Sequence, residues 1–308
     1  MATERRKVKK ILEPYDINLV PEANGLTNQS ITMCYHNSLM QCLMSLPSIR
    51  KTLETTKDNI LASIFRELWS AYEKKQPTDE INCRMWNAII ETSKKRNDLT
   101  KFNSGQQDVN EGLMLFLSVF EKSIPELYNL FTHSYKQCIG CTCCNDRKTI
   151  KQEDNTVINV NMTSHIEYKD KKGLEGYISH HTEILKEYTC KNCKSNQDKI
   201  SLSSITRLGD IIVVMFTEKY KEKKFIDFPR EMRFPSDGGY LIYKLVAQCE
   251  HMGSQTSGHY NVKVVRRNGV FLINDSTVSK DELSPTPNTY LIFYHFDKKS
   301  STSVDLTV

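Results

Sequence analysis

The sequence predicts an α+β protein, and two observations carry that prediction. From about residue 35 to residue 130 the apolar residues recur at helical intervals, whereas short runs of β-forming residues follow Phe131. A helical half followed by a strand-rich half is typical of the α+β class. The chain has 308 residues, 39% of them hydrophobic and 26% charged, which is the composition of a soluble globular protein with a sizeable core.

Three helices stand out in the first half. Two of them have apolar residues on one face, at Leu39, Leu43 and Leu46 and at Leu61, Ile64 and Leu68. The third is predicted to begin near Ser104, because Ser104 and Gln107 have the spacing of a capping box. Its apolar face continues until Pro125 ends the helix.

The second half is predicted to form strands at residues 156–160, 211–216, 240–248, 260–265 and 290–294. Helical propensity remains only near residues 177–187. The longest apolar run, residues 211–216, is too short to span a bilayer, and the basic start of the chain lacks the apolar segment of a secretory signal. We therefore expect no membrane association.

The chemistry is indicated by three distant residues: Cys34, His259 and Asn274. A thiol, an imidazole and a carboxamide in this chain order are typical of papain-type cysteine hydrolases. A cysteine that starts a helix has its thiolate stabilised by the helix N-terminus, an imidazole keeps it deprotonated, and a carboxamide orients the imidazole. Taken alone, each of these residues is more often structural.

The base and its orienting residue are expected on a hairpin formed by residues 262–265 and 270–273. A two-residue turn at Asn268–Gly269 would pair Asn274 with Lys263 and not with His259. The sequence therefore predicts a bulge or a longer loop between the two strands.

Several motifs in this chain, in the same order, resemble those of the ubiquitin-specific proteases. Residues 25–28 and 34–43 resemble the family's cysteine box, and residues 106–111 (QQDVNE) its Gln-Gln-Asp box. Residues 251–253, 258–260 and 274–275 resemble its histidine box, and residues 290–294 the strand that closes the domain. The resemblance implies a papain-like fold with a helical thumb, a β-rich palm and β fingers clipped by zinc.

The resemblance also implies the reaction, hydrolysis of the (iso)peptide bond that follows the Gly-Gly end of ubiquitin. Cys34 would be the nucleophile and His259 the general base, with Asn274 orienting the imidazole. Asp275 would share that orienting work, and Asn28 would donate a hydrogen bond to the oxyanion. The implied substrate-binding residues are Gln107, Asp108, Glu111, His251, Gly258 and Tyr260.

The acidic residues and the glycines of this set would each contact the tail of ubiquitin. Asp108, with Glu111, would hold the basic tail of ubiquitin. Gly253 and Gly258 would flank a channel narrow enough to select a Gly-Gly tail.

The chain departs from the family pattern at two places. Asn28 lies six positions before Cys34 instead of five, so either Asn28 or Gln29 fills the oxyanion hole. Val270 or Phe271 stands where the family has a tryptophan. The irregular cysteine box motivates an alternative function, a ubiquitin-binding pseudo-protease of the same fold.

Six of the ten cysteines lie in two clusters, which in a reducing compartment indicates metal binding. Cys141 and Cys144, with Cys190 and Cys193, form two knuckles that can give four thiolates to one structural zinc ion. Cys138 with Cys141 is a competing first pair. A zinc-containing nucleic-acid binder would use the same knuckles and the net charge of +5, but it leaves the other boxes unexplained.

The predicted organisation is a basic arm at residues 1–20, a catalytic domain at 21–297 and a flexible tail at 298–308. Within the domain, the thumb would cover about 25–130, the fingers about 132–207 and the palm about 208–297. We expect a cytoplasmic or nuclear monomer whose partners are ubiquitin and ubiquitinated proteins.

Overall fold

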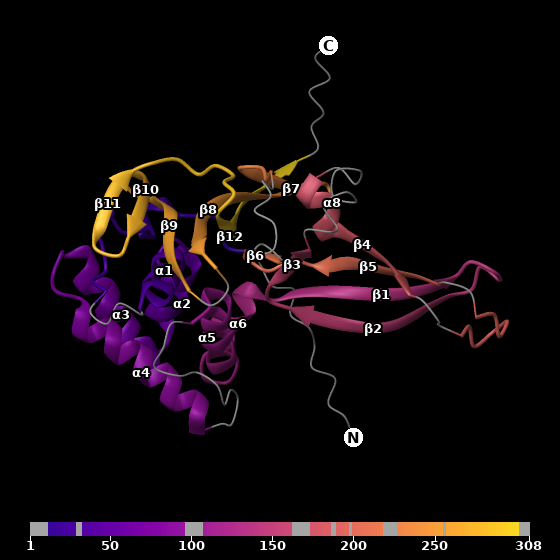
Figure 1. Ribbon diagram of the computed structural model, residues 1–308, viewed down its shortest axis with the longest axis horizontal. Helices are drawn as coiled ribbons and strands as arrows, with labels where there is room; N and C mark the ends of the chain where they lie inside the picture. Colours follow the sequence, from indigo (N-terminus) through magenta and orange to yellow (C-terminus); the bar gives the residue numbers. More distant parts are fainter. Residues whose placement is uncertain are drawn as a thin grey trace, which may run out of the picture.

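The fold combines one helical region with two sheets, which confirms the predicted α+β class. The computed structural model describes residues 12–28, 33–95, 107–161, 173–185, 189–196, 199–217, 227–254 and 257–301. The helices lie at one end of the molecule, the larger sheet lies beside them, and the long strands of the smaller sheet project from the other side (Figure 1).

The helical region contains six helices before the first strand among the described residues. They are α1 (Cys34–Leu43), α2 (Pro47–Thr55), α3 (Ile60–Glu73), α4 (Asp79–Lys95), α5 (Val109–Ser123) and α6 (Pro125–Phe131), preceded by a short 3-10 helix, η1 (Ile17–Leu19). Local sequence explains where several begin. Proline occupies the first position of α2 and α6, and Asn59 caps α3 by accepting a hydrogen bond from the Ala62 N–H at 3.0 Å.

The four-stranded sheet, which we call the finger sheet, has the order β2-β1-β5-β4. Its strands are β1 (His133–Cys141), β2 (Arg147–Asn155), β4 (His180–Leu185) and β5 (Lys199–Arg207), all paired antiparallel. The two turns that carry the cysteine knuckles lie at its far end, so the sheet holds together cysteines that are about fifty residues apart in the sequence.

The eight-stranded sheet, which we call the palm sheet, has the order β11-β10-β9-β8-β12-β6-β3, with β7 also paired to β8. Its strands are β3 (Ile158–Asn161), β6 (Ile211–Thr217), β7 (Glu231–Ser236), β8 (Gly239–Gly253), β9 (Gly258–Arg266), β10 (Gly269–Asn274), β11 (Thr277–Lys280) and β12 (Thr289–Ser301). Helix α8 (Gly173–Ser179) follows β3 of the palm sheet and precedes β4 of the finger sheet in the chain.

The palm sheet separates two apolar cores. Ile211 and Val213 of β6 belong to the core shared with the helices, whereas Ile212 and Val214 belong to a second core with α8 and β7. Because side chains alternate between the faces of a strand, a strand buried on both faces reads as the continuous apolar run seen at residues 211–216.

Two predicted helix boundaries are wrong. Helix α5 begins at Val109 with Asp108 as its N-cap, and Ser104 lies outside the described residues. The predicted helix at 177–187 is in fact the end of α8 followed by β4. Here strand pairing with β5 overrides local propensity, since His180 to Leu185 align with Ser204 to Lys199.

The predicted bulge between the hairpin strands is also wrong. The β9–β10 ladder is regular, and its turn is Arg267–Asn268, one residue earlier than expected. One step beyond the last recorded pair, Ile273 with Val262, Asn274 lies opposite Asn261. His259 is then the diagonal neighbour of Asn274 on the same face, which is within side-chain reach.

Candidate active site

Cys34 is the first residue of α1, as the sequence predicts for a nucleophile at a helix N-terminus. Met33, the N-cap residue, makes no capping hydrogen bond with its side chain. Helix α1 packs against β9, β8 and β10, and all of its residues are buried, Cys34 completely. The other cysteine of the helix, Cys42, is held as a neutral thiol, because burial raises its pKa far above the usual range.

His259 and Asn274 are joined by a hydrogen bond of 2.5 Å between the imidazole Nε2 and the carboxamide Oδ1. An oxygen can only accept, so Nε2 is the donor, and in the neutral ring Nδ1 is then the acceptor. The side chain of His259 is 36% exposed. The structure thus brings together the predicted base and the predicted orienting residue, with the second ring nitrogen available for proton transfer.

Asp275 connects this pair to the nucleophile helix. It has a left-handed backbone (φ 50°), which Asp tolerates, in the two-residue turn between β10 and β11. Its Oδ1 accepts a hydrogen bond from Asn37 of α1 at 2.9 Å, and its Oδ2 lies 4.0 Å from the His259 Nε2. Its backbone carbonyl accepts from the Leu26 N–H at 2.9 Å.

Asn28 lies in the same polar cluster. Its Nδ2 donates to the Asp275 Oδ2 at 3.0 Å, and its Oδ1 accepts from the Met33 N–H at 3.1 Å, just before Cys34. Gln29, the alternative oxyanion donor, lies outside the described residues.

Asp108 caps α5 and also contacts the palm. Its Oδ1 accepts from the N–H groups of Asn110 (2.8 Å) and Glu111 (3.1 Å), while its Oδ2 accepts from the Tyr260 hydroxyl at 3.0 Å. The Tyr260 ring packs on His251, with centroids 4.5 Å apart. Asp108 therefore joins the helical region to β9. Gln107, immediately before it, is half-buried.

Gly258 has a packing reason to be glycine. A Cβ at this position would lie 2.1 Å from the His251 Nε2, so the imidazole occupies the space of the missing side chain. Gly253, its partner across the β8–β9 hairpin, has a φ of 132°, which favours glycine. Both glycines are thus required by the hairpin itself, whether or not a peptide passes beside them.

The four predicted metal ligands converge at the tip of the finger sheet. The sulfur atoms of Cys141, Cys144, Cys190 and Cys193 all lie within 4.8 Å of one another, a cluster that could hold a metal ion. The backbone N–H groups of Cys144 and Cys143 lower the pKa of Cys141 to about 6, whereas desolvation and the neighbouring thiols raise the pKa of Cys144 to about 11. Of these two ligands, Cys141 is therefore the one that favours the thiolate that a metal requires. Cys138, the competing ligand, lies outside this cluster.

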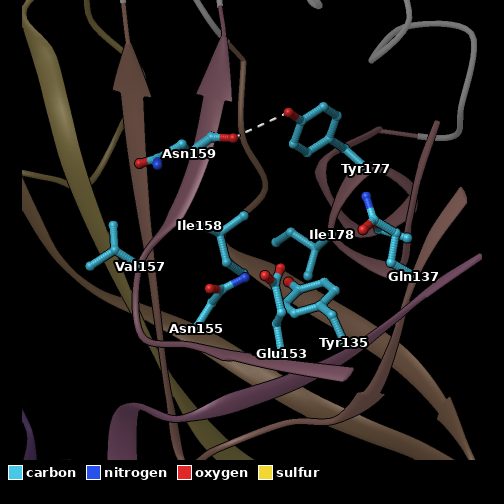
Figure 2. Close-up of a pocket in the computed structure, with 10 residues that line it drawn as sticks. Tyr135, Gln137, Glu153, Asn155, Val157, Ile158, Asn159, Tyr177 and Ile178 are labelled. Carbon is cyan, nitrogen blue, oxygen red and sulfur yellow. Dashed lines mark hydrogen bonds between the residues drawn. The ribbon is translucent and has the colours of Figure 1, made fainter. Parts of the chain in front are cut away.

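A pocket of about 240 Å³ lies elsewhere, where the finger sheet meets β3 and α8 (Figure 2). Tyr135 and Glu153 reach into it from β1 and β2, and Tyr177 of α8 closes one side by donating to the Asn159 carbonyl at 3.1 Å. None of the predicted catalytic residues lines it.

Sequence reasoning missed the buried polar residues behind the site. Asn37 holds Asp275, and its Oδ1 accepts from Asn82 of α4 at 2.9 Å. Arg266, at the end of β9, is only 1% exposed. An arginine rarely lies in a core, and nothing in the local sequence distinguishes this one from its exposed neighbour Arg267. Asn37 falls within the cysteine box, which is the one signal that could have found it.

Among the described residues, no helix is both long and apolar enough to cross a membrane.

Comparison with curated proteins finds ubiquitin carboxyl-terminal hydrolase 26 of rice (Oryza sativa subsp. japonica), 27% identical over 85% of this chain, and ubiquitin carboxyl-terminal hydrolase 8 of Saccharomyces cerevisiae, 25% identical over 88%. The matched region spans 26% of the rice protein and 70% of the yeast protein.

Solved structures with a similar fold include the SAGA DUB module Ubp8/Sgf11/Sus1/Sgf73 bound to monoubiquitin. That match has a TM-score of 0.71 at 20% identity, and it covers 94% of this chain and 72% of the other. The same module bound to ubiquitin aldehyde matches with a TM-score of 0.70. Residues 24–294 also match the family model described as ubiquitin carboxyl-terminal hydrolase. The chain therefore belongs to the ubiquitin carboxyl-terminal hydrolase family.

Proposed function

We propose that this protein is a cysteine hydrolase that cleaves the bond after the C-terminal glycine of ubiquitin. The observation that carries the proposal is the hydrogen bond from His259 Nε2 to Asn274. With Nε2 as the donor, the neutral ring has Nδ1 as its proton acceptor, and His259 lies on a strand that packs against the helix of Cys34. A nucleophile, a base and an orienting residue are the minimum set for this chemistry.

The residues have these roles in the reaction. His259 Nδ1 takes the proton of the Cys34 thiol, and the thiolate attacks the carbonyl carbon. Asn28 donates a hydrogen bond from its carboxamide, which Asp275 holds in place, to the oxyanion. The imidazolium then protonates the leaving amine as the C–N bond breaks. Water, deprotonated by the same imidazole, hydrolyses the thioester and restores the thiol.

The choice of ubiquitin as substrate rests on relatives. The curated relatives are named ubiquitin carboxyl-terminal hydrolases, and the solved neighbours carry ubiquitin or its aldehyde. We propose that Gln107, Asp108 and Glu111 meet the basic tail at the start of α5, where Asp108 remains partly exposed. On the palm side of that helix, Tyr260 orients the Asp108 carboxylate, and His251 with Gly258 shapes the hairpin beside it.

Zinc is the metal that best fits the finger tip. Four thiolates in two C-x-x-C knuckles form a closed tetrahedral set, which zinc prefers and which leaves no position open for catalysis. We therefore propose one structural zinc ion per chain, held by Cys141, Cys144, Cys190 and Cys193, that ties the two turns of the finger sheet together.

The complete burial of Cys34 has a consequence for the reaction. An extended substrate can reach the sulfur only if the groups over it move when the tail enters. The alternative function, a pseudo-protease that binds ubiquitin without turnover, corresponds to the case in which they do not move.

A ubiquitin probe with an electrophilic C-terminus tests the proposal. We expect a covalent adduct and hydrolysis of a fluorogenic ubiquitin substrate, both lost in Cys34→Ala. Cys83→Ala, which changes a half-buried cysteine on α4, is the matched control and should keep both. Measurable ubiquitin binding without an adduct would replace the hydrolase with the pseudo-protease. Other modifiers assayed in parallel would define the specificity.

The cellular location and the oligomeric state are the last two proposals. A cytoplasmic or nuclear location stays a prediction. The monomeric state stays a prediction, and the solved neighbours do not favour it, because they were determined as modules of several subunits. Light scattering of the purified chain would decide the oligomeric state.

A further inference from the structure

Arg266, the last residue of β9, is a cation buried among neutral oxygens. Among the described residues, no carboxylate forms an ion pair with it. Its Nη1 donates to the Ser45 hydroxyl and to the Val265 carbonyl (3.2 Å), and its Nη2 donates to the Gln41 carbonyl (3.0 Å) and to the Gln41 Oε1. The Arg266 Nε is buried without a hydrogen-bond partner among the described residues, so the cost of burying the charge is offset by these contacts of Nη1 and Nη2, which hold the oxygens in defined positions.

The oxygens that hold Arg266 belong to the end of the nucleophile helix. Gln41 lies in the last turn of α1, and Ser45 follows the helix. The carbonyls at a helix C-terminus carry partial negative charge, which favours a cation there. The guanidinium also lies 5.9 Å from the ring centre of Tyr72, a residue of α3. Arg266 therefore fastens the C-terminal end of α1 to the strand that begins with Gly258 and His259.

The same network extends to the loop that carries Asn28. The Tyr72 hydroxyl donates to the Asn24 carbonyl and contacts the Gln41 Oε1 at 2.9 Å, while the Gln41 Nε2 donates to the Asn24 carbonyl at 3.0 Å. The turn after Arg266 holds the start of this loop, because the Arg267 N–H donates to the Pro21 carbonyl at 3.2 Å. One buried cation thus connects three segments that are far apart in the sequence.

We infer that Arg266 is a positioning residue for the reaction, which rests on the proposed function. It couples the helix of Cys34, the strand of His259 and the loop of Asn28 from the side opposite the Asp275 cluster (α1 and β9 lie together in Figure 1). Asn37 and Asp275 join helix and palm near the sulfur, and Arg266 joins them at the far end. With both ends held, α1 cannot pivot on the sheet, and the sulfur keeps its place relative to the imidazole.

The test compares Arg266→Met with Arg267→Met. Methionine keeps the apolar stem of Arg266 but removes every donor. Arg267 is the matched control because it is the adjacent arginine, with a side chain 46% exposed and only a 3.9 Å ion pair to Glu22. Two readouts are needed at a temperature where each variant is folded: kcat and KM on a fluorogenic ubiquitin substrate, and the rate of Cys34 alkylation by iodoacetamide, measured on the Cys34 peptide by mass spectrometry.

For folded Arg266→Met we expect kcat to fall about 10- to 100-fold with KM within about twofold of wild type, because a displaced nucleophile costs rate and not binding. Alkylation of Cys34 near neutral pH should slow as well, whereas Arg267→Met should match wild type in both. If folded Arg266→Met equals Arg267→Met in both readouts, the inference is overturned.

Two further outcomes have their own measurement, one for a variant that does not fold and one for an inactive wild type. If Arg266→Met does not fold, Tyr72→Phe decides, because it removes only the hydroxyl contacts to Asn24 and Gln41. A lower kcat in folded Tyr72→Phe supports the inference, and wild-type kcat overturns it. If the wild-type protein does not hydrolyse ubiquitin substrates but Arg266→Met still changes Cys34 alkylation, the proposed function fails while the positioning role stands.

Discussion

Acidification should destabilise the fold through His36, a buried residue of α1. Burial lowers the pKa of His36 from 6.5 to about 4. Its Nε2 lies 2.8 Å from the Asn82 Oδ1, and the Asn82 Nδ2 donates to Asn37, so Nε2 must carry the proton. Among the described residues, Nδ1 is buried without a hydrogen-bond partner. Protonation of Nδ1 would therefore bury a charge with no acceptor.

The magnitude follows from the two pKa values. The folded-state pKa lies below the unfolded one, so the unfolded chain takes up a proton first as the pH falls. The contribution of His36 to the free energy of unfolding is complete above about pH 6.5, and it is lost as the pH falls towards about 4. The total is about 3 kcal/mol, of which about 2 kcal/mol is lost between about pH 7.5 and pH 5.

Urea unfolding of the wild type and of His36→Gln at these two pH values measures the effect. Glutamine keeps a donor for Asn82 and does not titrate, so the variant should lose about 2 kcal/mol less than the wild type. His180→Gln, which changes an exposed histidine at the start of β4, is the control and should behave as wild type. Equal losses in wild type and His36→Gln would refute the reasoning.

Three other perturbations have defined outcomes. Asn274→Ala should lower kcat about 100-fold with little change in melting temperature, because the imidazole of His259 loses its hydrogen-bond partner. An unchanged kcat in steady-state assays would argue against the orienting role of Asn274. Gly258→Ala should destabilise the fold by about 1–3 kcal/mol in denaturant unfolding, because the new methyl group meets the buried His251 ring, and a neutral result would contradict the packing described above. Cys190→Ser should lose the zinc ion, as measured by elemental analysis, and should have a lower melting temperature. Cys143→Ser, which changes an exposed cysteine outside the cluster, should keep both the zinc ion and the wild-type melting temperature. Zinc retained at wild-type level in Cys190→Ser would remove the finger-tip assignment.

The elements that the sequence predicted well are those whose signal is local. The apolar face of α3 and the continuous run of β6 follow from periodicity, and the two cysteine knuckles follow from spacing. Leu39 and Leu43 lie in α1 as predicted, but Leu46 lies beyond the end of that helix at Leu43. Errors arose where a long-range partner decided the outcome. Strand β4 forms because its backbone can pair antiparallel with β5. The start of α5 depends on Asp108, which accepts hydrogen bonds from two backbone N–H groups and from the Tyr260 hydroxyl of β9.

The sequence by itself determined which residue types this chain has for thiol chemistry and for metal binding, and in what order they occur. Only the tertiary structure decided how they meet. A turn one residue earlier than expected makes His259 the diagonal neighbour of Asn274, and Asp275 and Arg266 hold the nucleophile helix at its two ends. Local spacing cannot encode such contacts, because they join segments that are distant in the sequence, and only the folded chain brings these buried polar groups to the hydrogen-bond partners that they need.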